Sequence, residues 1–156
     1  MKKHVRIFAM LAVCVLALGT WTVLHGQNQP NGLPGGTYLT TITDANTGAF
    51  ASRSVITLHA DHSMISIDSG QGGPGALFSS QMGAWTAVPG GVIGRTLDFS
   101  FPQAGIARVD YNFKTTKDQT NGTITLTVFG LNDDPLGSGG TVAGNFNFTG
   151  VRIDAQ

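Results

Sequence analysis

Three segments in the second half of the chain alternate between apolar and polar residues: TLDFSF (96–101), ARVDYNFK (107–114) and TITLTVF (123–129). A period of two places every second side chain on the same face of a β-strand. Each segment is therefore predicted to be a strand with one buried apolar face and one solvated polar face. On this rule Phe99 and Phe101 point into the protein.

Five further segments, residues 37–43, 50–58, 63–69, 82–88 and 141–153, are rich in β-branched and aromatic residues. Turn-forming residues separate them, and no window after the N-terminal segment has the apolar spacing of a helix. Short connections favour antiparallel neighbours. The chain is therefore predicted to be all-β, as a single eight-stranded antiparallel up-and-down β-barrel, because closure removes exposed edges. A two-sheet β-sandwich is the alternative.

The N-terminal region has the layout of an export signal. Three basic residues precede an uninterrupted apolar run over residues 7–18. We therefore expect a signal peptide over residues 1–26, a flexible linker over residues 27–35 and the barrel domain over residues 36–156, with the cleavage position left open. The expected location is secreted or periplasmic. The alternative is an uncleaved anchor formed by residues 7–24, which would be the protein's one membrane contact.

Composition narrows the classes of partner. The single cysteine lies within the predicted signal, so the stability of the mature domain must come from packing without disulfides. Beyond the predicted signal, the chain has six lysine and arginine residues and nine aspartates, and it has no glutamate. Nucleic acid is not an expected partner, because phosphate binding needs a clustered basic face.

The stretch GQGGPG (70–75) matches the dinucleotide-binding pattern G-x-G-x-x-G. That pattern requires a helix of several turns after its last glycine, but a further strand begins near residue 82. We interpret the stretch as part of the longest connection in the domain, residues 70–81, and expect no cofactor. Leu77 and Phe78 would then belong to a flap over the barrel mouth.

Two clusters of potential metal ligands occur in the sequence, but neither has the spacing or geometry of a known metal site. His59, Asp61 and His62 lie in a predicted tight turn, whose side chains diverge. Asp133 and Asp134 lack the spacing of a calcium-binding loop. We therefore expect no bound metal.

The aspartates of the predicted strands are expected to face solvent. Asp68, Asp98 and Asp110 all lie on the polar side of their segments, and the same alternation directs Ile65 and Ile67 inward. No serine has a nucleophile-elbow context. No catalytic residue is therefore predicted.

Gly36, Thr37 and Tyr38 open the first predicted strand, and Arg152 ends the last. This pairing resembles the calycin barrels, above all the lipocalins, which begin with G-x-W and pack a late arginine across that ring. Here Tyr38 takes the place of the tryptophan. The resemblance implies that the two ends of the domain meet. It implies no single function, because such barrels include both carriers and cyclases such as allene oxide cyclase.

The expected function is that of an exported non-catalytic barrel that binds a small apolar molecule in its interior. A barrel of this size either is filled by its own side chains or holds one small ligand. The alternatives are a cofactor-independent cyclase or isomerase, with Tyr38 or Tyr111 as hydrogen-bond donor, and a cell-envelope interaction module. The candidate ligand-binding residues are Tyr38, Leu77, Phe78, Trp85, Phe99, Phe101, Tyr111 and Phe113.

Overall fold

The computed structural model describes residues 35–72, 77–102 and 104–154. The predicted signal and nearly all of the predicted linker lie outside the described residues. All regular elements are strands: β1 (Gly36–Asp44), β2 (Phe50–Leu58), β3 (Ser63–Asp68), β4 (Leu77–Phe78), β5 (Gln81–Val88), β6 (Gly91–Phe101), β7 (Gly105–Thr115), β8 (Gln119–Gly130) and β9 (Thr141–Arg152). The described ranges hold no helix that could cross a membrane.

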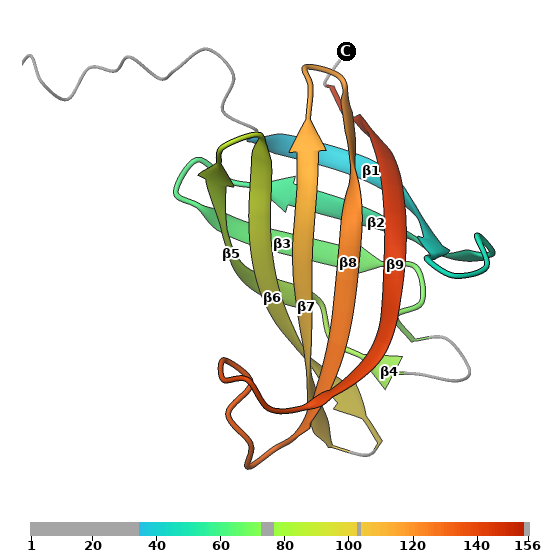
Figure 1. Ribbon diagram of the computed structural model, residues 1–156, viewed down its shortest axis with the longest axis vertical. Coiled ribbons are helices and arrows are strands. Elements are labelled where there is room, and N and C mark those ends of the chain that lie inside the picture. The colour runs from blue at the N-terminus through green and yellow to red at the C-terminus, as the bar shows by residue number, and fades with distance from the viewer. Residues whose placement is uncertain (1–34, 73–76, 103, 155–156) are drawn as a thin grey trace, which may run out of the picture. The chain divides into compact units, whose positions relative to one another are not determined.

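Eight of the strands form a closed antiparallel barrel (Figure 1). Each long strand pairs with the next along the chain, and β1 pairs with β9 to close the ring. The predicted eight-stranded up-and-down barrel is confirmed, and the sandwich alternative is wrong. The short strand β4 is an addition that the sequence did not predict. It pairs with the end of β6, where Leu77 lies opposite Phe101.

The two ends of the domain meet where β1 and β9 pair. Tyr38 lies opposite Arg152 in the register, and the Arg152 guanidinium covers Gly36, where an added Cβ would lie 2.9 Å from its Cζ. The Tyr38 side chain is buried, and burial raises the pKa of its hydroxyl. The meeting of the two ends that the sequence suggested is therefore observed.

The half of the barrel that contains the β5–β6 and β7–β8 turns, uppermost in Figure 1, holds the filled hydrophobic core. Its core includes Tyr38, Met64, Trp85 and Phe113, all of them buried. The Trp85 indole Nε1 donates a hydrogen bond of 3.0 Å to the His59 carbonyl oxygen. The large apolar side chains of opposite strands pack against each other in this half and form the hydrophobic core.

Two inward-facing glycines allow this close packing. An added Cβ at Gly94 would lie 2.6 Å from the Met64 sulfur, so the absence of a side chain there makes room for Met64. An added Cβ at Gly122 would overlap the Asn112 carbonyl oxygen of the neighbouring strand β7. Strongly coiled strands need such positions, because neighbouring backbones approach each other closely.

Two strands present the opposite face to the one predicted. In β6, Asp98 is buried inside the barrel, whereas Phe99 and Phe101 are 53% and 52% exposed on the outside. In β3, Asp68 lines the interior and Ile67 is exposed. The predicted inward direction of the two phenylalanines and of Ile65 and Ile67 is wrong, as is the predicted outward direction of the two aspartates.

The physical reason is that alternation defines two faces but does not say which one faces inward. The register decides: Asp98 lies opposite Ala107, and Ala107 shares the inner face of β7 with Val109 and Tyr111. Asp110 points outward as predicted and pairs with Arg95 and Arg108.

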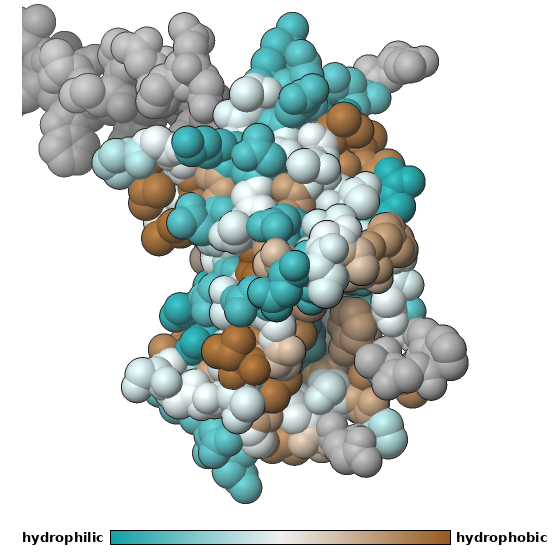
Figure 2. Space-filling view, turned by 45° about the vertical axis from the view of Figure 1, so that its right-hand side comes forward, coloured by the Kyte–Doolittle hydropathy of each residue, from teal (hydrophilic) through white to brown (hydrophobic). Residues whose placement is uncertain are grey.

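The displaced apolar residues form part of the outer surface. Figure 2 shows apolar surface among polar atoms at the lower end of the barrel. On neighbouring strands, Met82 lies opposite both Ile65 and Leu97, and Leu77 lies opposite Phe101. In the cavity half of the barrel, β3 and β6 therefore turn polar side chains inward and apolar side chains outward, although both strands also contribute a buried apolar residue, Met64 and Val92, to the filled core.

Candidate functional site

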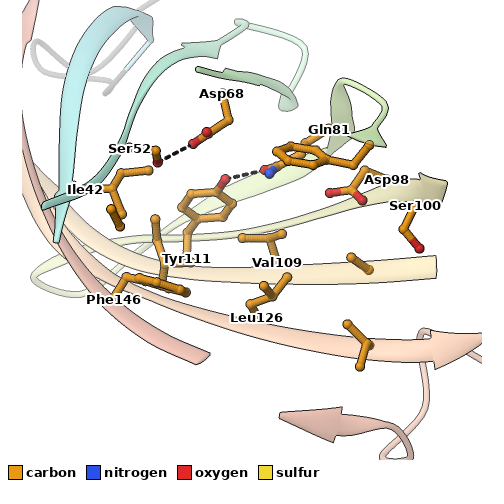
Figure 3. A pocket seen from close by; sticks show the side chains of 15 residues that line it. Ile42, Ser52, Asp68, Gln81, Asp98, Ser100, Val109, Tyr111, Leu126 and Phe146 are labelled. Carbon is orange, nitrogen blue, oxygen red and sulfur yellow. Dashed lines mark hydrogen bonds between the residues drawn. The ribbon is translucent and has the colours of Figure 1, made fainter. Parts of the chain in front are cut away.

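The half of the barrel opposite the filled core contains a cavity of about 350 Å³ (Figure 3). It lies at the end that carries the β1–β2, β3–β5, β6–β7 and β8–β9 connections. Its volume falls within the range of ligand pockets, about 300–1,000 Å³. The lining residues are Ile42, Ala51, Ser52, Asp68, Phe78, Gln81, Asp98, Ser100, Ala107, Val109, Tyr111, Ile124, Leu126, Val128 and Phe146.

One wall of the cavity is apolar. Strands β7, β8, β9 and β1 contribute aliphatic and aromatic side chains, among them Val109, Leu126, Phe146 and Ile42. Phe148 lies between this wall and the filled core, with its ring centroid 5.8 Å from that of Phe113 and 6.3 Å from that of Tyr111. This wall can bury the apolar body of a ligand and offers it no polar group.

The facing wall is polar. Strands β2, β3, β5 and β6 contribute Ser52, Asp68, Gln81, Asp98 and Ser100 to it. Figure 3 shows the labelled polar side chains pointing toward the common space, opposite the apolar residues. The cavity therefore has two chemically different sides.

Tyr111 reaches across from β7 and joins the polar wall. Its hydroxyl donates a hydrogen bond of 2.6 Å to Gln81 Oε1, which also accepts one of 3.2 Å from Thr96 Oγ1. Burial raises the pKa of Tyr111 to about 12. The hydroxyl is therefore neutral across the physiological range. Gln81 is held by its oxygen, which leaves its amide N–H groups without a hydrogen-bond acceptor among the described residues.

The two carboxyl groups of the polar wall differ in how they are held. Asp68 accepts hydrogen bonds from Ser52 Oγ at 2.8 Å and from the Gly70 N–H at 2.7 Å. Asp98 is 4% exposed, and no described residue donates a hydrogen bond to its carboxyl group. Burial raises the pKa of Asp98 to about 6. Asp98 can therefore gain or lose a proton near neutral pH, a property typical of functional sites.

The cavity takes in some of the residues predicted from the sequence and leaves others outside. Tyr111 and Phe78 line it. The others lie elsewhere: Tyr38, Trp85 and Phe113 in the filled core, and Leu77, Phe99 and Phe101 exposed on the outside.

Sequence reasoning missed the polar wall, above all Gln81 and Asp98. A usable signal existed in the hairpin between β6 and β7. Its short connection pairs Ser100 with Gly105, so even-numbered residues of β6 lie beside odd-numbered residues of β7. Since Val109 and Tyr111 point inward, Asp98 must point inward too.

In the two clusters considered as metal sites, the aspartates stabilise turns. Asp61 accepts hydrogen bonds from the backbone N–H and hydroxyl of Ser63. Asp133 accepts one from the Gly130 N–H, and Asp134 accepts one from the Leu136 N–H. Within residues 35–72, 77–102 and 104–154, no three His, Cys, Asp or Glu side chains gather closely enough to hold a metal ion.

No model of a protein family, no curated protein and no solved structure matches this chain. The likeness to lipocalins therefore remains a resemblance of motif and architecture. A barrel of this shape is compatible with both binding and catalysis. The function must therefore be inferred from the geometry of the cavity.

Proposed function

We propose that this protein is an exported, non-catalytic barrel that binds a small, largely apolar molecule in the open half of its interior. The cavity of about 350 Å³ with its continuous apolar wall carries the proposal. Pockets for small molecules are typically concave and mainly apolar, with a few polar groups that orient the ligand. Export rests on the sequence of residues 1–26, whose basic and apolar pattern is typical of a signal peptide.

Two consecutive residues of β4 provide a matched test of this proposal. Phe78 lines the cavity, whereas Leu77 is 48% exposed on the other side of the same strand. Titration with the neutral fluorophore N-phenyl-1-naphthylamine should give a saturable rise in fluorescence as the probe enters the apolar cavity. Phe78→Ala should weaken binding about tenfold, since an aromatic contact contributes on the order of 1.4 kcal/mol. Leu77→Ala should bind as the wild type does.

Native mass spectrometry of the protein purified from its host should show a bound small molecule that solvent extraction removes. Equal loss of probe binding in both β4 variants would show that Phe78 has no specific part. Complete failure of the wild type to take up the probe, together with a ligand-free mass, would refute the proposal.

A cofactor-independent isomerase or cyclase is the second candidate, and Asp98 favours it. A buried carboxyl group that titrates near neutral pH, close to the neutral Tyr111 hydroxyl, is suited to moving a proton on a bound molecule. The two functions differ in the fate of the ligand. A carrier returns the extracted molecule unchanged after prolonged incubation, whereas an enzyme converts it at a rate that Asp98→Asn abolishes.

A further inference from the structure

The charge of the cavity is one-sided. Among the described residues that line it, Asp68 and Asp98 are acidic, and none is a lysine, arginine or histidine. The nearby arginines of β6 and β7, Arg95 and Arg108, lie on the outer face and pair with Asp110. The interior therefore presents negative charge that no described side chain neutralises.

Both carboxyl groups act on the same part of the cavity. After burial, which is the largest cause, the charges of Asp68 and Asp98 each add to the upward shift in the pKa of Tyr111. The hydroxyls of Ser66 and Thr96 oppose this shift. The Tyr111 hydroxyl thus lies in the field of two carboxylates that come from different strands, β3 and β6. A positive group placed beside it would be attracted by both.

Asp98 lacks the partner that a buried carboxylate needs. The residue is 4% exposed, its carboxyl group opens onto the cavity, and it receives no hydrogen bond from any described residue. Asp68, in contrast, is held by Ser52 and the backbone of Gly70. A buried charge without a partner is costly, so this position favours a ligand group that supplies both a hydrogen bond and positive charge.

We infer that the polar end of the ligand is an organic cation, such as a protonated primary amine, which Asp98 binds directly and which Asp68, on strand β3 of the same polar wall, attracts. This inference rests on the proposed function and specifies the class of ligand. The apolar wall formed by β7, β8, β9 and β1 buries the hydrocarbon body of the same molecule. That wall favours an organic cation over a hydrated metal ion, which would need polar ligands on all sides.

Three probes of equal chain length separate charge from hydrophobic burial. Octylamine, 1-octanol and octanoate are titrated against the protein loaded with N-phenyl-1-naphthylamine, and displacement is measured at pH 7.5. Octylamine should bind at least about tenfold more tightly than 1-octanol, because a charge-assisted hydrogen bond is added to the same apolar contact. Octanoate should bind most weakly, since the two carboxylates repel it.

Asp98→Asn removes the charge at nearly constant shape. In this variant octylamine should lose at least about tenfold in affinity, while 1-octanol binds as before. Asp118→Asn is the matched control, because Asp118 is exposed in the β7–β8 turn at the far end of the barrel. It makes the same change in net charge and should leave all three affinities unchanged.

The pH profile of the wild type tests the inference without any variant. Octylamine, like a lysine side chain, stays protonated up to about pH 10. Its affinity should fall at least about fivefold as Asp98 takes up a proton between pH 7.5 and pH 5, whereas that of 1-octanol should not change. Asp68 and Tyr111 are the other titratable groups that face this site.

The outcomes separate the inference from the proposed function. Equal affinity for the three probes, or tighter binding of octanoate, overturns the inference and leaves the proposed cavity function intact. Octylamine affinity that is the same in Asp98→Asn and wild type also overturns it. If no probe displaces the fluorophore and the fluorophore itself does not bind, both the inference and the proposed function fail.

Discussion

At the scale of single residues, Asp98 is the most informative side chain in the protein. It lies in the middle of β6, faces the cavity and is almost completely buried. Its neighbours Gln81 and Tyr111 are hydrogen-bonded to each other. No described residue donates a hydrogen bond to Asp98 itself. A stable core has no use for such a group, because an unpaired buried carboxylate destabilises the folded state. The organic cation that we propose as ligand would supply the partner that Asp98 lacks.

The stability of the protein should depend on pH through Asp98. Its pKa is about 6 in the folded protein against 3.8 for the exposed group, so the folded state binds the proton more tightly. The loss of folding stability caused by the ionised Asp98 is therefore absent below about pH 4, grows as pH rises and is complete above pH 6. At about 1.4 kcal/mol per pKa unit, Asp98→Asn should stabilise the protein by roughly 2 to 3 kcal/mol at pH 7.5.

Urea unfolding from pH 4 to pH 8 measures this difference. The gain from Asp98→Asn should vanish at the acidic end, and Asp118→Asn should show no such trend. A gain that stays constant over the whole range would contradict the proposed cause.

At the scale of elements, pairing decides what each strand buries. Residues 96–101 of β6 and 107–114 of β7 show the same clean alternation, yet the β7 segment buries its apolar residues and the β6 segment buries its polar ones. Register fixes this outcome, since Asp98 lies opposite Ala107 and Thr96 opposite Val109. A shift of one residue would reverse every side chain of β6. The register of the β6–β7 hairpin, which pairs even-numbered residues of β6 with odd-numbered residues of β7, thus turns the polar side of β6 toward the cavity.

Close approach of neighbouring strands should make Gly122 intolerant of a side chain. A Cβ at this position would overlap the Asn112 carbonyl oxygen and the Phe113 side chain. Gly122→Ala should therefore destabilise the protein by about 3 kcal/mol.

Gly139 supplies the matched control, because an added Cβ there meets no atom within 4 Å. Gly139→Ala should change the free energy of unfolding by less than about 0.5 kcal/mol. Both values come from chemical denaturation, and a similar small effect in the two variants would show that β8 can move away from β7.

At the scale of the whole molecule, the barrel consists of a packed half and a half that contains the cavity. The half with Tyr38, Met64, Trp85 and Phe113 is packed and supplies stability. The other half keeps its cavity and exposes apolar residues near the mouth, such as Leu77 and Val128. Loops and strand ends that line a cavity are typical places for function on a rigid scaffold.

Substituting one phenylalanine in each half allows a direct comparison of their packing. Phe113 is buried in the packed half, whereas Phe146 lines the cavity. Phe113→Ala should cost about 3 to 5 kcal/mol of stability, because it empties a closely packed site. Phe146→Ala should cost roughly 1 to 2 kcal/mol, because one side of its ring already faces empty space.

The free energies of unfolding in urea, together with fluorophore affinity, check this comparison. Phe146→Ala should change the affinity, and Phe113→Ala should leave it unchanged at a temperature where the variant is folded. Equal losses of stability would contradict the division into a packed half and an open half.

Sequence alone was sufficient for the class of fold. The period of two, the even spacing of turn residues and the pairing of Tyr38 with Arg152 predicted a closed antiparallel barrel, because these are local or terminal features of the chain. It was also sufficient to identify Tyr111 and Phe78 among the cavity residues.

Tertiary structure alone decided which face of β3 and of β6 is inside. The inward direction of Asp98 and Gln81, and the outward direction of Phe99 and Phe101, depend on the register with neighbouring strands. Alternation is symmetric between the two faces of a strand, so it cannot choose between them. The pairing of β6 with its neighbours in the closed barrel fixes the direction of these side chains. The same pairing places the Asp98 carboxyl group, to which no described residue donates a hydrogen bond, on the wall of the cavity.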